Sequence, residues 1–424
     1  MSAGAVRGAN LWEWGSAVNR IGPVEGQNIL FLQGPMGDFF KRLDTLFRSR
    51  GARTFRIGFN AGDRFFSHGD NYTPYRGRPG KEWKRFIGRF LREHAIDRIF
   101  LFGDCRHYQS IAIRIAMKEG VEVFVFEEGY VRPHYITLER WGVNDYSHLS
   151  RDPEFYRALP EIDVPEPRHA RSSKTKMVYS ASLYYALSNL FQFRYPHYRH
   201  HRDFSAIREA FHGIRGAVRK LYYPRIDRRL IPELTEASSG RFYFVPLQTH
   251  NDFQILQHSE FRSIEKFIIT VLESFARHAP EGTKLLFKHH PVDRGRKNYQ
   301  RFIREQAALL GVGKRVMIAH DLPLPLIFRH TRATVTVNST VGLTSIAYGV
   351  PTLTLGRAVY DIDGLTNAGK PLEEFWNDPR KPDEGLYRKF HAYIVDKTQL
   401  NGSFYGRMPV EFENGTIFER SEEE

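Results

Sequence analysis

The sequence has one cysteine among 424 residues, Cys105, which excludes an internal disulfide framework and a cysteine-rich zinc site. No apolar run approaches the roughly 20 residues that a membrane-spanning helix needs. The N-terminus lacks the basic, apolar and small-residue pattern of a secretory signal. These absences predict a protein of the reducing cytoplasm.

Acidic residues are also scarce beside basic ones, because 48 Asp and Glu stand against 62 Lys and Arg and give a formal net charge of +14. This excess favours an anionic partner such as a nucleotide, a nucleic acid or an acidic lipid surface. The sequence has no zinc finger, RNP or Gly-x-x-Gly module, so we expect no nucleic-acid partner. A merely basic soluble surface is the alternative.

Apolar and β-branched runs alternate with helical patterns in both halves of the chain, and the length favours two domains. The first half predicts strands at 28–33, 54–59, 98–102 and 121–126, with helices from 39, at 81–95 and at 108–118. The second half predicts strands at 242–247, 284–288, 315–318, 333–337 and 351–355, and helices at 260–278, 298–310, 323–330 and 341–348. This order is typical of two Rossmann-like α/β domains, whose ligand crevice faces the carboxyl ends of the strands.

We therefore expect an N-terminal Rossmann-like domain over residues 1–160 and a second one over 240–370. Residues 161–239 lack a convincing strand and predict a helical, aromatic and basic insert. Residues 371–424 predict a C-terminal helical tail.

Polar side chains follow several predicted strands. Asn338, Ser339 and Thr340 precede a predicted helix whose first N–H groups can bind an anion, although an ordinary N-cap explains the same residues. His290 comes before Pro291, which keeps it extended and suits a hydrogen bond to a phosphate, whereas His289 points to the opposite face. These positions predict a sugar–nucleotide site.

Carboxylates occupy equivalent positions in both halves. Asp252 follows the strand that ends near Gln248, and Glu127 and Glu128 end the last clear strand of the first half. Paired carboxylates suit glycosyl transfer, although each alone is compatible with a solvated loop. Asp361-Ile-Asp363 imitates a metal-binding Asp-x-Asp, but it lies past the last strand and we expect it to shape a loop.

The chain resembles the bacterial capsule polysaccharide biosynthesis and export family, whose members include retaining β-Kdo glycosyltransferases. The resemblance is carried by 126–130, 245–252, 288–291, 338–340 and 349–356, and it covers most of residues 27–370. It implies a GT-B-like fold with two domains facing a central cleft. The second domain would bind CMP-Kdo, and the first would receive the acceptor.

The resemblance also implies roles for individual residues. Asp252 looks like the nucleophile and Glu128 like the acidic residue opposite it, but this chain has Glu127-Glu128-Gly129 where relatives have Glu-Asp-Gly, so either glutamate remains a candidate. The expected donor-binding residues are Gln248, Lys288, His290, Pro291, Asn338, Ser339 and Thr340. The expected acceptor-binding residues are Gly34, Asp104, Tyr130 and Arg132.

The function implied is retaining transfer of β-Kdo from CMP-Kdo to a (lyso)phosphatidylglycerol acceptor, through a covalent intermediate, in synthesis of the capsule linker. CMP leaves as a monophosphate, so we predict an enzyme without metal or cofactor. One alternative is an inverting sialyltransferase-like enzyme that uses Asp252 as a base. Another is a non-catalytic export adaptor.

The aromatic and basic segment 179–201 predicts contact with the anionic inner face of the bacterial inner membrane, where the protein would be peripheral. Other capsule assembly proteins are further expected partners. Packing between domains is the alternative role for these rings, which are Tyr184, Tyr185, Phe191, Phe193, Tyr195 and Tyr198.

Overall fold

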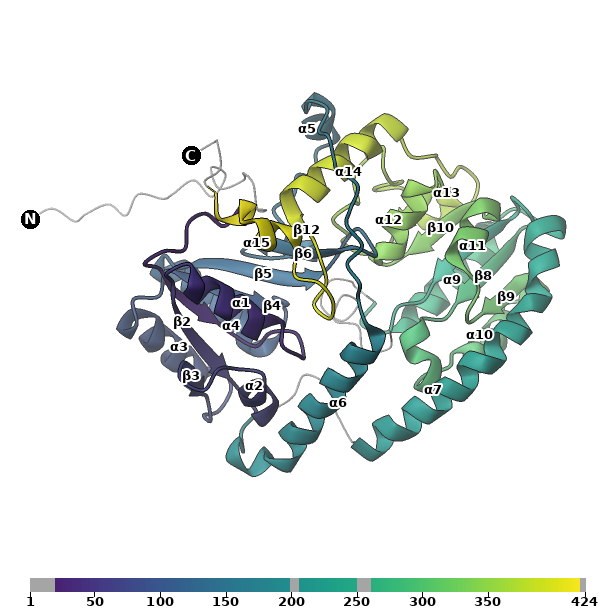
Figure 1. Cartoon of the computed structure of the whole chain (residues 1–424). Coiled ribbons are helices and arrows are strands. Elements are labelled where there is room, and N and C mark those ends of the chain that lie inside the picture. Colours follow the sequence, from purple (N-terminus) through teal and green to yellow (C-terminus); the bar gives the residue numbers. More distant parts are fainter. Residues whose placement is uncertain (1–19, 199–205, 250–260, 420–424) are drawn as a thin grey trace, which may run out of the picture. The chain divides into compact units, whose positions relative to one another are not determined.

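The computed structural model describes residues 20–198, 206–249 and 261–419, which form two compact units (Figure 1). Of the described residues, unit 1 comprises 20–149, 162–198 and 392–419, and unit 2 comprises 150–161, 206–249 and 261–391. The predicted insert 161–239 is thus divided between the units. The predicted tail 371–424 is divided as well, within helix α14 (Glu384–Thr398).

Unit 1 is built on a seven-stranded sheet in the order β12-β6-β5-β4-β1-β2-β3. Strands β1 to β5 pair in parallel, and β6 and β12 pair antiparallel at one edge. The strands are β1 (Asn28–Phe31), β2 (Arg53–Gly58), β3 (Tyr72–Pro74), β4 (Arg98–Phe102), β5 (Glu122–Glu128), β6 (Tyr135–Arg140) and β12 (Gln399–Asn401). The helices are α1 (Phe39–Ser49), α2 (Ala61–Phe65), α3 (Lys81–Glu93), α4 (His107–Glu119), α6 (Lys174–Leu190) and α15 (Val410–Asn414).

Apolar side chains cover both faces of this sheet, because successive residues of a strand point to opposite sides. In β5, Val123 and Val125 join the core under α3 and α4, whereas Phe124 and Phe126 join a phenylalanine-rich core under α1. A parallel sheet buried on both faces needs such continuous apolar runs. The central strands are therefore recognisable in the sequence as continuous apolar runs.

Unit 2 is built on a five-stranded parallel sheet in the order β11-β10-β7-β8-β9. The strands are β7 (Phe242–Pro246), β8 (Lys284–Lys288), β9 (Val316–Ala319), β10 (Ala333–Thr336) and β11 (Thr352–Thr354). The helices are α5 (Pro153–Ala158), α7 (Ala206–Asp227), α9 (Ile264–His278), α10 (Gln300–Leu309), α11 (Leu324–His330), α12 (Thr340–Ala347) and α13 (Leu372–Phe375).

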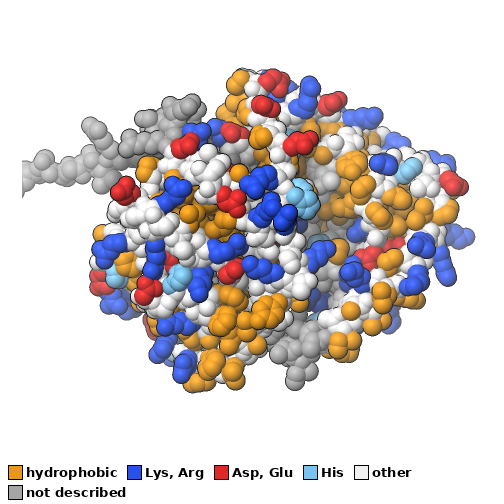
Figure 2. Space-filling model, viewed as in Figure 1, with side chains coloured by type: hydrophobic (Ala, Val, Ile, Leu, Met, Phe, Trp, Pro, Cys, Tyr) orange, Lys and Arg blue, Asp and Glu red, His pale blue; other side chains and the backbone are white. Residues whose placement is uncertain are grey.

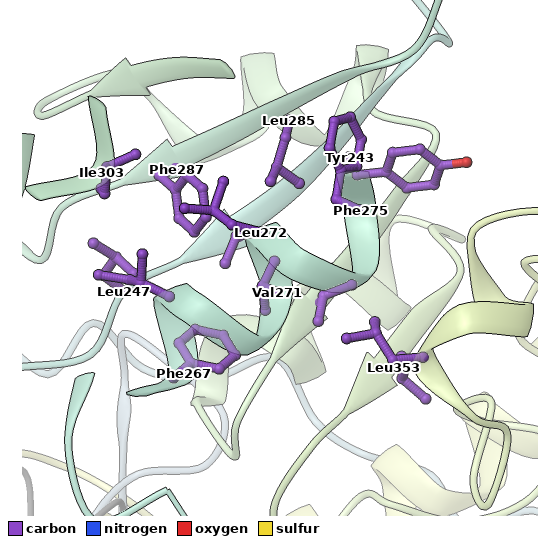
Figure 3. Packing of buried hydrophobic residues seen from close by; sticks show 14 of the residues in the cluster. Tyr243, Leu247, Phe267, Val271, Leu272, Phe275, Leu285, Phe287, Ile303 and Leu353 are labelled. Atoms are coloured by element: carbon purple, nitrogen blue, oxygen red, sulfur yellow. The ribbon is translucent and has the colours of Figure 1, made fainter. Parts of the chain in front are cut away.

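Helix α9 supplies much of the larger core of unit 2. Figure 3 shows Phe267, Val271 and Leu272 of this helix beside Leu285 and Phe287 of β8, and all five are buried. The helix begins at Ser263, whose hydroxyl accepts from the backbone N–H of Lys266. Its apolar face thus anchors β7 and β8, whose carboxyl ends carry predicted site residues.

The predicted α/β class and the two Rossmann-like units are confirmed. Strands β4 and β8 have the predicted bounds, but β3, β6 and β12 were not predicted. β3 and β12 are three-residue strands at the two edges of the sheet, and β12 pairs with β6 from far along the chain. Among the described residues, no helix has the length and apolar character needed to cross a membrane.

Candidate active site

The carboxyl ends of β7 and β10, which are neighbouring strands, are joined by an amide pair. Gln248 Nε2 donates to Asn338 Oδ1 at 3.0 Å, and the backbone N–H of Asn338 donates to Gln248 Oε1 at 3.4 Å. Gln248 is buried and Asn338 half-buried. The structure therefore brings these two predicted donor-binding residues together and fixes the orientation of their amides.

The next residue, Ser339, is the N-cap of α12. Its hydroxyl accepts from the backbone N–H of Val341 at 3.2 Å, and its carbonyl accepts from the hydroxyl of Tyr360. Gly342 allows this approach, since a Cβ there would lie 2.2 Å from the Tyr360 hydroxyl oxygen. Thr340 is the first residue of α12 and is half-buried. The helix N-terminus is therefore held rigidly beside the amide pair, and its dipole favours an anion there.

His290 lies after β8, on the other side of β7 from Asn338 in the strand order. Its Nδ1 accepts from the backbone N–H of Val292 at 3.2 Å, which caps the short 3₁₀ helix η6 (Pro291–Gly295). Because Nδ1 accepts this hydrogen bond, Nε2 is the ring nitrogen that carries the proton in this arrangement. Pro291 is exposed at the first position of η6. The role of His290 as a donor to phosphate stays a prediction.

His289 faces the interior, as the alternation of an extended chain predicts. Its Nε2 accepts from the backbone N–H of Tyr299 at 2.9 Å, and its ring stacks on that of His320 with centroids 4.6 Å apart and planes 4° apart. Burial, with His320 as a second cause, lowers the pKa of His289 to about 4. His289 is therefore a neutral core residue at neutral pH.

Lys288 ends β8, and its side chain is buried. Burial lowers the pKa of its ammonium group, while the charges of Asp321 and Asp227 oppose this shift. Arg294 pairs with Asp321, its Nε lying 2.9 Å from Oδ2. Lys288 therefore lies in a charged cluster under the strand end, which sequence reasoning did not recognise beyond the lysine itself.

Asp252, the predicted nucleophile, lies outside the described residues. In the sequence it comes three residues after Thr249, on the segment that leaves β7. β7 lies between β10 and β8 in the sheet.

In unit 1 the two glutamates that end β5 face opposite sides of the sheet. Glu127 Oε1 accepts from the backbone N–H of Glu128 at 3.0 Å. Burial, helped by the charges of Glu128 and Asp104, raises the pKa of Glu127 to about 7, although that backbone hydrogen bond and the charge of Arg106 oppose the shift. Such a carboxyl is poised to accept or release a proton near neutral pH.

Glu128 is exposed, and its carboxyl interacts electrostatically with Arg132. Partial desolvation raises the pKa of its carboxyl and Arg132 lowers it, but the shift is weakened by water because the side chain is exposed. Arg132 is itself exposed, and its Nε donates to the carbonyl of Gly129 at 3.2 Å. Of the two glutamates, Glu127 is the less exposed.

The other predicted acceptor-binding residues of unit 1 have internal partners. Asp104 Oδ2 accepts from the backbone N–H of Val143 at 2.8 Å, and the buried hydroxyl of Tyr130 donates to Glu139 at 2.5 Å. Gly34 is buried after β1, and a Cβ there would lie 2.6 Å from the Phe40 ring. These contacts give Asp104, Tyr130 and Gly34 a structural role, because they hold neighbouring segments together or allow close packing.

A buried polar network at the ends of β1 and β2 was missed from the sequence. Gln33 Nε2 donates to the Tyr184 hydroxyl at 2.8 Å and to Asp63, whose Oδ1 also accepts from that hydroxyl at 2.9 Å. Burial raises the pKa of Asp63, and Asn60 caps α2 beside it. The network ties α6 to the sheet. The Asn-Ala-Gly-Asp run after β2 was the available signal, since it follows a strand as the other motifs do.

This network changes the interpretation of the aromatic segment. Tyr184, Tyr185 and Tyr195 are buried in unit 1, and the half-buried Tyr198 stacks on Phe59 with ring centroids 6.3 Å apart. The prediction that these four rings lie in a membrane interface is wrong, because hydrogen bonds and core contacts turn them inward. Phe193 is exposed, and Phe191 is half-buried.

Across the three described stretches of chain, no group of three or more His, Cys, Asp or Glu side chains is placed to hold a metal ion. Asp361 Oδ1 accepts from the Thr366 hydroxyl at 2.7 Å, and Asp363 forms an isolated bridge with Thr366. These contacts agree with the expectation that the Asp-x-Asp sequence shapes a loop.

Comparison with known sequences identifies the family. Residues 97–405 match the family described as capsule polysaccharide biosynthesis protein. The chain belongs to this family. The resemblance inferred from the strand-end motifs is therefore confirmed.

Relatives match along most of their length. The capsule polysaccharide export protein KpsS of Escherichia coli is 39% identical over 382 residues, covering 90% of this chain and 98% of KpsS. The capsule polysaccharide modification protein LipB of Neisseria meningitidis serogroup B is 38% identical over 401 residues, covering 90% and 92%. Among solved structures, the KpsC beta Kdo 2,7 transferase of Thermosulfurimonas dismutans aligns with a TM-score of 0.43 at 12% identity, over 92% of this chain and 98% of that one.

Proposed function

We propose that this chain is a glycosyltransferase that moves Kdo from CMP-Kdo to a (lyso)phosphatidylglycerol-type lipid with retention of configuration, in synthesis of the capsule linker. The observation that carries the proposal is the cluster of Gln248, His290 and Asn338 at the carboxyl ends of three adjacent parallel strands, in a member of a capsule biosynthesis family. This edge is where nucleotides bind in open α/β sheets.

The donor's phosphate fits the groups at this edge. The N-terminus of α12, held by Ser339, favours an anion, and the Nε2–H of His290 donates a hydrogen bond to one of its oxygens. The Gln248–Asn338 pair positions amide groups for the cytosine or ribose. Because CMP leaves as a monophosphate, these groups suffice to stabilise its charge, and we propose that no metal or other cofactor is needed.

Retention requires two displacements at the anomeric carbon. The Asp252 carboxylate attacks this carbon, the bond to the CMP phosphate oxygen breaks, and CMP leaves with the bonding electrons. An acceptor hydroxyl then attacks the same carbon, gives its proton to Glu127 and releases the Asp252 carboxylate. The pKa of Glu127 near 7 supports this role, because a base of that pKa is partly ionised at neutral pH.

Intact mass spectrometry after incubation with CMP-Kdo and the lipid acceptor tests the mechanism. We expect Glu127→Gln to accumulate a covalent Kdo adduct, since only the second displacement needs the base, and Asp252→Ala to form none. Glu128→Gln is the matched control and should turn over without accumulation. An adduct of equal yield in Asp252→Ala would contradict the assignment of the nucleophile.

The product of CMP-Kdo and a fluorescent phosphatidylglycerol analogue, analysed by NMR, tests the transfer itself. A β-linked Kdo lipid formed in the presence of EDTA is the expected result. An inverted linkage would favour a sialyltransferase-like enzyme, and a requirement for added manganese would refute metal independence. Absence of CMP release would favour an export adaptor.

We further propose that the protein works as a peripheral protein on the cytoplasmic face of the inner membrane, with other capsule assembly proteins.

A further inference from the structure

Helix α7 of unit 2 carries a stripe of exposed apolar side chains. Their spacing along the helix is three, four, three and one residues, which places them on one face. The stripe extends over about 17 Å. It consists of Phe211 (59% exposed), Ile214 (69%), Val218 (62%), Leu221 (71%) and Tyr222 (57%).

A different face of α7 packs against the rest of unit 2. Gly216 lies against Gly295 of η6, where a Cβ on Gly216 would be 3.6 Å from the Gly295 backbone. Tyr223 is buried and stacks on His320 with ring centroids 3.9 Å apart. Unit 2 therefore does not use the stripe for its own core. Contiguous exposed apolar surfaces of this kind are typical of interaction sites.

The charged residues within the stripe, between residues 211 and 222, are all basic. Between residues 211 and 229 the only acidic residue is Asp227, which is buried and accepts from the backbone N–H groups of His320 and Asp321. The basic residues of this stretch are Arg215, Arg219, Lys220, Arg225, Arg228 and Arg229. Figure 2 shows hydrophobic and basic side chains side by side along the edge where α7 runs. An apolar stripe on a helix that is rich in Lys and Arg is typical of helices that lie in an anionic lipid interface.

We propose that α7 docks unit 2 on an anionic phospholipid bilayer, with the stripe in the acyl boundary and the flanking cations at the lipid phosphates. This locates the membrane contact on α7 instead of on the aromatic segment 179–198, and only its biological purpose rests on the proposed lipid acceptor. The bilayer is favoured over a second copy of the chain because pairing two stripes would bring two cationic helices together.

Vesicle flotation of the full chain tests the proposal, with phosphatidylcholine vesicles compared against vesicles that contain equal parts of phosphatidylcholine and phosphatidylglycerol. We expect flotation with the anionic vesicles only, and weaker binding as salt rises. The double variant Ile214→Ser/Leu221→Ser should bind at least about tenfold more weakly, since each side chain loses its transfer into an apolar phase. The matched control is Leu309→Ser at the end of α10, where Leu309 is 79% exposed and outside the stripe.

A second variant, Lys220→Glu/Arg225→Glu, should also weaken binding to anionic vesicles, and it leaves the apolar stripe intact. Wild-type binding by the Ile214→Ser/Leu221→Ser variant would overturn the proposal. So would a wild-type dimer that this variant converts to a monomer while vesicle binding stays unchanged, because the stripe would then belong to a second copy. CMP release with a water-soluble acceptor should be the same in all variants, which separates failure of docking from failure of the proposed transfer.

Discussion

The adjacent histidines His289 and His290 should respond to substitution in opposite ways. Burial holds the pKa of His289 near 4, against an ordinary value of 6.5. As pH falls from about 6.5 to about 4, the unfolded chain takes up a proton at this position and the native chain does not. Stability should therefore decrease towards low pH, by up to about 1.4 kcal/mol per pH unit and by about 3 kcal/mol in all. Above about pH 6.5 this contribution to the pH dependence vanishes.

The perturbation is His289→Gln, measured by urea unfolding at a series of pH values between neutral and about pH 4. A glutamine amide oxygen is able to accept from the Tyr299 N–H as Nε2 does, but it does not titrate. The variant loses the stacking on His320, so its stability at neutral pH should fall. Its free energy of unfolding should then decline less steeply with falling pH than that of the wild type. The difference in slope should correspond to the one proton that the unfolded wild-type chain takes up at His289.

His290→Gln is the matched control. His290 is half-buried and caps η6, so this substitution should leave the pH dependence of the free energy of unfolding as it is in the wild type. It should weaken binding of CMP, measured by calorimetry. If His289→Gln and the wild type lose stability in parallel down to about pH 4, the reasoning from burial is refuted. If His290→Gln binds CMP as the wild type does, its assignment to the donor phosphate is refuted.

Three further outcomes follow from the geometry. In Glu127→Gln, transfer to acceptor should fall by about 10²-fold or more, and the wild-type decline of rate below about pH 7 should disappear from the pH profile. Gln248→Leu should raise the KM for CMP-Kdo by about tenfold, because it leaves the Asn338 amide without its partner, and a KM equal to that of the wild type would contradict this. Tyr184→Phe should lower the free energy of unfolding by about 1–3 kcal/mol, since Asp63 and Gln33 lose a buried hydrogen-bond partner, and thermal unfolding measures this.

The central strands of both sheets were predictable because a parallel strand covered on both faces must be apolar along its whole length. β4 and β8 were found at their full bounds for this reason. The edge strands β3 and β12 were not, because three residues carry no periodic signal and their pairing depends on segments distant in the sequence.

The sequence by itself determined where polar residues end the strands and to which family the chain belongs. Strand-end motifs are local in the sequence, so they can be recognised without knowing how the chain packs. Only the tertiary structure decided which of two adjacent candidates faces which environment. The sequence left Glu127 and Glu128 as equal candidates, and the desolvation that raises the pKa of Glu127 comes from the packing around it. Tyr130, a predicted acceptor-binding residue, and Tyr184, a ring predicted to contact the membrane, are turned inward by Glu139 and Asp63. Burial is a property of neighbours brought together by folding, and residue type alone does not contain it.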